Sequence, residues 1–341
     1  MFKQIALAGI AAVALTCGAA LAQDKPVELK FAHWLPATHP LQPLGFEVWA
    51  KSVEAASGGS IKVTMYPAQQ LGKAPDHYDM ARDGIADIAW INPGYQPGRF
   101  PVIAAGELPF LINNAKQGSG ALDKWYRAYA EKEMKDVKVC VTHLHDPGAL
   151  HSKKAISNPA QLKGMKIRPA HATMAQFMTL LGATNAQVSA PEARDALEKG
   201  VADAITFPWN SILIFGIDKV VTYHLDIPFY VTTFAWVMNK GTYGKMSAAQ
   251  KKVIDDHCTT DWAIKVASGW ADNEASGKEK LSTAPGHTLV KASPADIADW
   301  RKAAEPLREK WAENVKKAGY DPKKVFDDLN AELKARNSLY E

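Results

Sequence analysis

The chain has 341 residues, of which 47% are hydrophobic and 22% are charged, as in an ordinary globular protein of about two domains. Its formal charge of +4 is spread along the sequence, whereas a nucleic-acid-binding protein would concentrate basic residues in a patch. Binding to nucleic acid is therefore not expected. A mean hydropathy of -0.20 excludes a polytopic membrane protein, and three cysteines are too few for a disulfide scaffold.

The first 22 residues are predicted to be a secretory signal peptide. Lys3 gives a positive start, residues 5–21 are apolar, and Ala20-Leu21-Ala22 places small residues where a signal peptidase reads them. The alternative is a membrane anchor, but the apolar run is short for a span of about 20 residues. We therefore expect a periplasmic mature chain, residues 23–341, with no stable membrane insertion after cleavage.

Cys140 and Cys258 remain in the mature chain. The expected compartment is oxidising, so a disulfide between them is permitted. Two separate buried thiols are equally compatible with the sequence.

The mature chain begins with a strand, a helix and a second strand. Residues 27–31 alternate between apolar and polar, residues 41–56 repeat their apolar side chains at helical spacing, and residues 61–65 alternate again. Strands separated by a helix in this way are parallel, which indicates an α/β fold.

A second pattern occurs twice, at residues 83–88 and 199–204. In each copy a helix ends at a glycine, Gly84 or Gly200, and a short apolar strand then leads into a loop containing a proline. Two such units about 116 residues apart predict two lobes. Ligands of open α/β sheets bind beyond the carboxyl ends of the strands, so the residues just after these strands are the first candidates for a site.

The C-terminal third is predicted to be helical. Residues 247–250 have the form of a capping box, and no proline follows until after Thr283, so one helix of about 50 Å is expected from Ala248. Such a helix is long enough to lie along both lobes. Further helices are expected after Ser293 and after Asp321.

Several phrases of the chain, in this order and spacing, resemble the solute receptors of TRAP transporters, the DctP-type family. They are GGSIKVTMYPAQQLG (58–72), DGIADIAWINPGYQPGRFP (83–101), ELPFL (107–111), LKGMKIR (162–168) and WVMNKGTY (236–243). The resemblance covers essentially the whole mature chain. It implies an α/β, two-lobed periplasmic binding protein fold with a long helix spanning both lobes.

The resemblance also implies a function. Such a receptor closes on a small organic carboxylate and delivers it to the TRAP membrane permease subunits; it is not an enzyme and needs no cofactor. On the family pattern, lobe I holds residues 23–146 and 234–273, and lobe II holds residues 147–233 and 274–341.

Arg168 is the leading candidate for the ligand-binding site. It matches the arginine of the family's G-x-K-[IL]-R strand, which binds the ligand carboxylate. The guanidinium offers a planar fork of donors that fits a carboxylate. The alternative is an arginine in a structural ion pair.

The chain departs from the sialic acid and dicarboxylate receptors at two positions. Gly148 aligns with a second arginine that those receptors often carry, and Phe207 replaces an asparagine that usually helps to hold the carboxylate. Trp209 and Asn210 follow, and Asn210 is a candidate for the amide role. Losing a cation and an amide while gaining rings predicts a monocarboxylate with an apolar or aromatic body. The alternative is that Phe207 and Trp209 only pack the core of their lobe.

The remaining candidates also follow strands. In the first lobe they are His33, Trp34, Asn92 and Tyr95, with Trp34 as the stacking wall and Asn92 as the polar contact; in the second lobe and the crossover they are His151 and Phe234, with His171 and Trp236 nearby. For each of them the alternative is ordinary packing.

Other chemistries have less support. His143, His145, Asp146 and His151 could present metal ligands, but histidines without a supporting cluster are weak signals, and no metal site is predicted. The recognisable metallohydrolase, serine-hydrolase and nucleotide-binding motifs are missing from the sequence. Two rival functions stay open: a receptor that reports its ligand to a membrane sensor, and a secreted enzyme.

Overall fold

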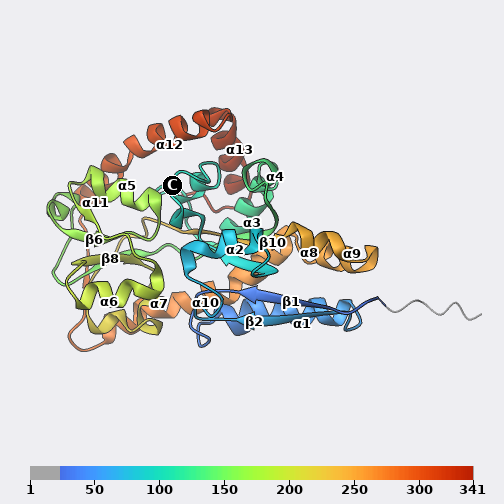
Figure 1. Ribbon diagram of the computed structural model, residues 1–341. Helices are drawn as coiled ribbons and strands as arrows, with labels where there is room; N and C mark the ends of the chain where they lie inside the picture. The colour runs from blue at the N-terminus through green and yellow to red at the C-terminus, as the bar shows by residue number, and fades with distance from the viewer. Residues whose placement is uncertain (1–23, 341) are drawn as a thin grey trace, which may run out of the picture.

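The computed structural model describes residues 24–340, and the predicted signal peptide lies outside them (Figure 1). The chain forms two β-sheets side by side, each flanked by helices. The first sheet has the strand order β2-β1-β3-β10-β4. Its strands are β1 (Val27–Ala32), β2 (Ile61–Tyr66), β3 (Ile88–Ile91), β4 (Val137–Leu144) and β10 (Thr233–Asn239).

The second sheet has the order β11-β9-β5-β8-β6-β7. Its strands are β5 (Ala149–Ser152), β6 (Lys166–Arg168), β7 (Thr184–Asn185), β8 (Ala204–Phe207), β9 (Tyr223–Leu225) and β11 (Thr288–Val290). Both sheets are mixed. β1 is parallel to β2 and β3, and β6 is parallel to β7 and β8. β10 is antiparallel to β3 in the first sheet, and β5 is antiparallel to β8 in the second. The predicted α/β fold with two lobes is confirmed.

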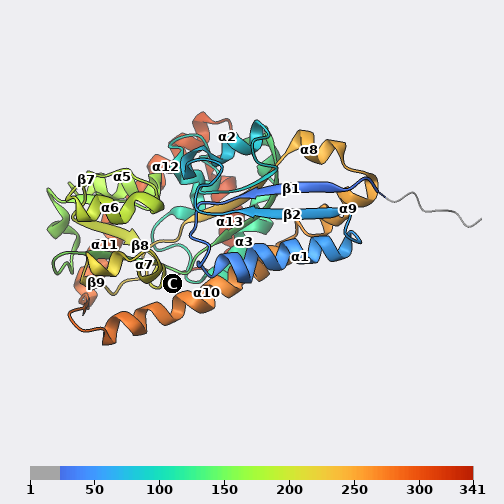
Figure 2. The same cartoon turned by 60° about the horizontal axis from the view of Figure 1, so that its bottom comes forward.

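The helices cover the faces of these sheets (Figures 1 and 2). They are α1 (Glu47–Ala56), α2 (His77–Arg82), α3 (Ala115–Tyr126), α4 (Ala130–Glu133), α5 (Ala172–Leu180), α6 (Ala193–Glu198), α7 (Ser211–Ile214), α8 (Lys240–Lys245), α9 (Ala248–Asp256), α10 (Thr260–Thr283), α11 (Pro294–Ala304), α12 (Pro306–Lys317) and α13 (Pro322–Ala335). Among residues 24–340, none of the helices is long and apolar enough to cross a membrane.

The long helix is present, but it begins later than predicted. The expected single helix from Ala248 to Thr283 is divided into α9 and α10, because the chain breaks at residues 257–259. Thr259 is extended, and its hydroxyl accepts a hydrogen bond from the backbone N–H of Trp262, so it caps a new helix. The 24 residues of α10 extend for about 36 Å. They pass along both sheets and contact α3 and β4 on one side and α7 and β11 on the other (Figure 2).

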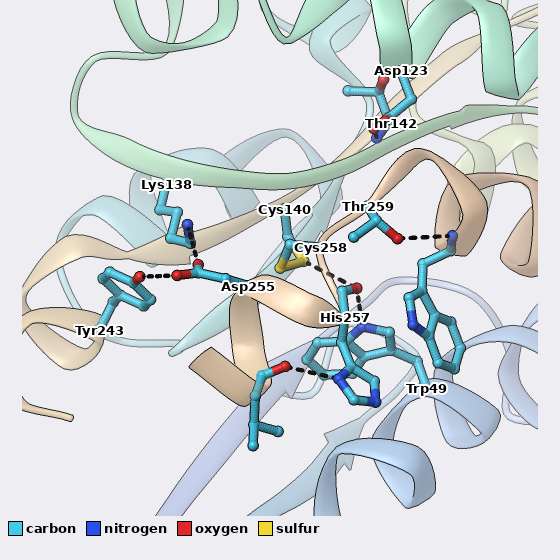
Figure 3. The surroundings of a disulfide bond; sticks show 12 residues. Trp49, Asp123, Lys138, Cys140, Thr142, Tyr243, Asp255, His257, Cys258 and Thr259 are labelled. Atoms are coloured by element: carbon cyan, nitrogen blue, oxygen red, sulfur yellow. Dashed lines mark hydrogen bonds and ion pairs between the residues drawn. A yellow bond between two sulfur atoms is a disulfide. The ribbon is translucent and has the colours of Figure 1, made fainter. Parts of the chain in front are cut away.

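A disulfide fixes this break. Cys140 on β4 is bonded to Cys258, between α9 and α10, and both residues are buried (Figure 3). Beside it, Trp49 of α1 donates a hydrogen bond from Nε1 to the carbonyl of His257, at 2.8 Å. Of the two alternatives that the sequence left open, the disulfide is the one that forms.

The last helix packs beside the first sheet. Trp125 of α3 donates a hydrogen bond from Nε1 to the carbonyl of Val325 on α13, at 3.0 Å, and the Tyr129 hydroxyl donates to Asp328 at 2.6 Å. Residues 274–341 were predicted to belong wholly to the second lobe, so α13 differs from that assignment. The rest of the lobe division stays a prediction.

Candidate ligand-binding site

A cavity lies between the two sheets, where several strands end. It encloses about 360 Å³ of space between atoms, including its open mouth. Its walls come from the loops after β1 and β3, the ends of β6 and β8, the segment before β10, and α10. The lining residues are Trp34, Leu35, His39, Asn92, Tyr95, His145, Arg168, Ala170, Ala190, Thr206, Phe207, Pro208, Ser211, Phe215, Tyr230, Thr232, Phe234 and Trp270.

Arg168 is the buried cation of this cavity. It ends β6, where it pairs with Ile205 of β8, and only 1% of its surface is exposed. Its Nε donates to the carbonyl of Val188 at 3.0 Å, and its Nη1 donates to the carbonyl of Thr206 at 3.4 Å. Its Nη2 donates to the hydroxyl of Tyr95 at 3.2 Å.

The guanidinium of Arg168 is not neutralised by a carboxylate. None of the ion pairs within residues 24–340 includes it. Three of its five N–H groups are used in the hydrogen bonds to neutral oxygens, so two N–H groups remain to be donated. A buried charge without a counterion is costly, so this arrangement favours the arrival of an anion.

Tyr95 adds a further donor beside Arg168. Its hydroxyl oxygen accepts from Nη2 of Arg168 and, at 2.9 Å, from the backbone N–H of Ala190. These two bonds occupy both lone pairs of the oxygen, so the hydrogen of the hydroxyl is left for an acceptor in the cavity. Tyr95 therefore joins the first lobe to Arg168 of the second lobe and strengthens the anion site.

The first lobe contributes a stack of rings. Trp34 lies on Trp90 with the ring centroids 4.4 Å apart, and Trp90 lies on Phe234 at 4.6 Å. Trp270 of α10 packs against Phe234 at 5.6 Å. On the other side, the ring of Phe207 lies 5.6 Å from Cζ of Arg168. A flat apolar molecule would contact rings on both sides of the cavity.

Two histidines line the cavity without adding charge. Burial lowers the pKa of His39 and of His145 to about 3, so both are neutral at physiological pH. His145 donates from Nδ1 to the carbonyl of Asp146 and accepts at Nε2 from the backbone N–H of Thr232. His39 accepts at Nδ1 from a backbone N–H, so its Nε2 donates to the Ser211 hydroxyl. Arg168 is thus the one cation among the lining residues that the structure describes.

The structure brings together six of the ten residues predicted for the site. Arg168, Trp34, Asn92, Tyr95, Phe207 and Phe234 all line the cavity. Asn92 uses its amide for structure, because its Oδ1 accepts from the backbone of Gly94 and its Nδ2 donates to the carbonyl of Ala170 at 3.3 Å. The bond to Ala170 joins the loop after β3 to the segment after β6.

The other four residues do not line the cavity. His33 is turned away from Trp34 and packs on Phe46, with the ring centroids 4.8 Å apart. His151 lies on β5 and shares a hydrogen bond of 2.8 Å with His224, and Trp209 packs against the ring of His151 at 5.2 Å. Asn210 bonds instead to Asn273 and Lys280 of α10.

His171 and Trp236, the two residues noted near the predicted site, do not line the cavity either. His171 caps α5 and lies 3.1 Å from the carboxylate of Glu107, and Trp236 is fully buried in the core beside the first sheet.

Several lining residues were not found in the sequence. Tyr230 precedes β10 and Trp270 lies on α10, and neither follows the end of a parallel strand. His39 follows β1 and Ser211 follows β8, but both lie farther along the chain than the residues considered directly after those strands. Nothing in residues 24–340 groups three or more metal-ligating side chains around a common point.

Comparisons with known proteins identify the family of the chain. The family model of the bacterial extracellular solute-binding proteins, family 7 (DctP), matches residues 31–314. A TRAP solute-binding protein from a marine metagenome, specific for aromatic acid ligands and solved with 3-hydroxybenzoate, is 33% identical. The match covers 92% of this chain and 99% of that chain, with a TM-score of 0.86.

Two further solved structures are similar to the chain. A TRAP solute-binding protein from Rhodoferax ferrireducens, with copurified benzoate, is 29% identical over 91% of this chain and 98% of that chain, with a TM-score of 0.86. A TRAP solute-binding protein from Bordetella bronchiseptica, with (R)- and (S)-mandelate, is 27% identical. The match covers 91% of this chain and 99% of that chain, with a TM-score of 0.85.

Curated relatives match over less of their length. The alignments span 40% of an uncharacterized protein from Sinorhizobium fredii, and 52% and 65% of solute-binding proteins from Albidiferax ferrireducens and Verminephrobacter eiseniae. The family model nevertheless covers most of the chain. The chain therefore belongs to family 7 of the bacterial extracellular solute-binding proteins, the DctP family of TRAP receptors, as its resemblance predicted.

Proposed function

We propose that this chain is the periplasmic receptor of a TRAP transporter and that it binds a small monocarboxylate with an aromatic body. The observation that carries the proposal is Arg168, a buried cation without an acidic partner in an aromatic-lined cavity. A ligand carboxylate would accept its two remaining N–H groups and neutralise its charge. The ring would lie between the Trp34 stack and Phe207.

The charge of the cavity favours one carboxylate over two. His39 and His145 are neutral at physiological pH, so the lining offers a single positive charge. A dicarboxylate would bury a second negative charge with no cation to match it, which costs free energy. The three similar structures bind benzoate, 3-hydroxybenzoate and mandelate, each an aromatic molecule with a single carboxylate, and this supports the same ligand class here.

Binding from both lobes explains how such a receptor works. The Tyr95 hydroxyl of the first lobe meets Arg168 of the second, and Asn92 meets the carbonyl of Ala170. A ligand that contacts both lobes stabilises the closed arrangement over an open one. The closed, loaded receptor would then deliver its ligand to the membrane permease subunits, and no covalent bond is made or broken.

The test is a binding screen of the mature protein, refolded so that copurified ligand is removed. Benzoate, 3-hydroxybenzoate and mandelate are compared with succinate and with benzamide, which keeps the ring of benzoate without its charge. A ligand at 1,000 times its Kd stabilises the protein by about 4 kcal/mol, which a thermal-shift assay detects readily. We expect stabilisation by the aromatic acids alone.

Two results would contradict the proposal. Stronger binding of succinate than of benzoate would contradict the monocarboxylate assignment. Equal binding of benzamide and benzoate would show that the charge of the carboxylate does not contribute to affinity. Chromatography of the incubated ligand tests the remaining alternative, since an enzyme would convert it and a receptor returns it unchanged.

A further inference from the structure

Tyr230 lines the cavity and has an unused hydroxyl. Only 2% of the residue is exposed, and its hydroxyl has no hydrogen-bond partner among residues 24–340. Among the cavity-lining side chains, Nε1 of Trp34 is in the same condition. A buried donor that is left unpaired costs free energy, so a native site that keeps one is expected to use it.

The position of Tyr230 depends on Gly148. The backbone N–H of Gly148 donates to the carbonyl of Tyr230 at 2.9 Å, and the two residues form an isolated bridge. A Cβ atom at position 148 would lie 2.6 Å from Cε1 of Tyr230 and 2.8 Å from its hydroxyl oxygen. No side chain can therefore be placed at position 148 while Tyr230 keeps this position, and the phenol fills the space.

The Tyr230 hydroxyl also lies on the Arg168 side of the cavity. It is close to the side chain of Thr206, though not in the geometry of a hydrogen bond, and within the field of the Arg168 guanidinium. Thr206 connects the two, because its carbonyl accepts from Nη1 of Arg168 while its hydroxyl accepts from the backbone N–H of Ala170 at 2.8 Å.

The hydroxyl stays protonated at physiological pH. Burial raises the pKa of Tyr230 well above 10, because the phenolate would be poorly solvated, and the nearby Arg168 offsets this effect only in part. Tyr230 is therefore a permanent O–H donor, and it carries no charge of its own.

We infer that Tyr230 donates a hydrogen bond to the carboxylate of the ligand beside Arg168, filling the space that a second cationic side chain at position 148 would need. The inference rests on the proposed function. It completes the count of donors: two N–H groups of Arg168, the hydroxyl of Tyr95 and the hydroxyl of Tyr230 match the four lone-pair sites of a carboxylate. Because Tyr230 carries no charge, it adds a donor without adding to the single positive charge of Arg168, and this selects a monocarboxylate.

The variant Tyr230→Phe tests the inference, because it removes one oxygen and keeps the ring. Titration calorimetry is done with benzoate and with 3-hydroxybenzoate. The loss of a hydrogen bond to a charged group should weaken both ligands about tenfold to a hundredfold, and by the same factor. The melting temperature of the ligand-free variant should not fall, because the lost hydroxyl had no partner.

Tyr126→Phe is the matched control. Tyr126 is also buried, but it lies outside the cavity and its hydroxyl donates to Glu133 at 2.7 Å. This variant should lower the melting temperature and leave both affinities unchanged. A crystal structure of the benzoate complex gives a direct reading, with Oη of Tyr230 expected within about 3 Å of a carboxylate oxygen.

Three outcomes would overturn the inference. Wild-type affinity of Tyr230→Phe for benzoate would show that the hydroxyl does not contact the carboxylate. A loss confined to 3-hydroxybenzoate would place the hydroxyl against the ring substituent instead. If the wild-type protein binds neither acid, the proposed function fails and this inference fails with it, and that result is known before any variant is measured.

Discussion

The two sides of the cavity are built in different ways. The first-lobe side is a stack of rings, Trp34 on Trp90 on Phe234, which offers broad apolar contact from several side chains. The second-lobe side depends on Arg168, held in place by the carbonyls of Val188 and Thr206. The binding free energy from apolar contact is divided among many atoms, whereas a buried charge makes one large contribution to the binding free energy. The rings of the first lobe therefore recognise the shape of the ligand, and Arg168 of the second lobe recognises its charge.

The two lobes also differ in how they are held together. The first lobe is crosslinked by the disulfide between Cys140 and Cys258, whereas the second-lobe side of the cavity is attached to α10 by hydrogen bonds from Asn210 and Ser211 to the carboxylate of Glu274. We expect loss of the disulfide to alter stability more than selectivity. Changes at Arg168 should do the reverse.

The largest effect is expected at Arg168. Arg168→Met keeps an unbranched apolar stem and removes the charge, so it should weaken benzoate binding about 100-fold to 1,000-fold, or ~3–4 kcal/mol. The empty protein should melt at nearly the wild-type temperature, because an unpaired buried cation is lost together with its hydrogen bonds. Titration calorimetry and thermal melts measure the two quantities separately.

Arg194→Met is the control for that experiment. Arg194 lies on α6, half exposed, and pairs with Glu198 of the same helix at 2.8 Å. Its removal should change neither affinity nor melting temperature by a measurable amount. If Arg168→Met and Arg194→Met bind benzoate equally well, Arg168 does not recognise the charge of the ligand, and the proposed difference between the two sides of the cavity is wrong.

The next effect is the loss of the disulfide. The bridge joins residues 118 positions apart, and removing it by Cys140→Ala with Cys258→Ala should cost about 2–4 kcal/mol of stability. That corresponds to a fall in melting temperature of roughly 3–6 °C for a chain of this size. The order of preference among benzoate, mandelate and succinate should be unchanged, because neither cysteine lines the cavity.

Reductant provides the control. It should lower the melting temperature of the wild-type protein to that of the double variant and leave the double variant unaffected. A changed order of ligand preference in the double variant would show that the first lobe contributes to selectivity through the disulfide as well as through its rings.

Much of the fold could be predicted from local patterns. The alternation of β1 and β2, the helical spacing of α1, and the glycines that end helices before β3 and β8 are all short-range signals. Arg168 could be predicted for the same reason, since it ends a strand within a sequence phrase typical of the family. The break before α10 also had a local signal, because Thr259 is a good N-cap residue, but the absence of proline was given too much weight.

The rest of the site depends on contacts between distant segments. Trp34 and His33 are neighbours in sequence, but Trp34 lines the cavity whereas His33 packs on Phe46, which is 13 residues further along the chain than His33. Asn210 faces α10, whose side chains lie more than 60 residues away in the chain. Tyr230 can take its position only because Gly148 has no Cβ atom. Such pairings between segments distant in the chain are not visible in a single sequence.

The smallest of these effects is expected where α10 meets the second lobe. Gly277 packs directly on the backbone of the Trp209–Asn210 segment: a Cβ atom there would lie 2.2 Å from the backbone N of Asn210. One turn earlier, the carboxylate of Glu274 accepts from the backbone N–H of Asn210 at 2.5 Å and from Nε1 of Trp270 at 2.8 Å. Gly277 therefore sets how closely the second-lobe side approaches α10 and its cavity residue Trp270.

Gly277→Ala should push the two apart. We expect a loss of about 1–3 kcal/mol in stability, partly offset by the better helix propensity of alanine, and a loss of benzoate affinity of roughly threefold to tenfold. Gly244→Ala is the matched control, because Gly244 also lies in a helix and a Cβ atom there would meet nothing within 4 Å. It should bind benzoate as the wild type does and melt no lower. If Gly277→Ala behaves like Gly244→Ala in both assays, the approach of α10 to the second lobe does not control the cavity. The two sides would then be coupled only through the ligand.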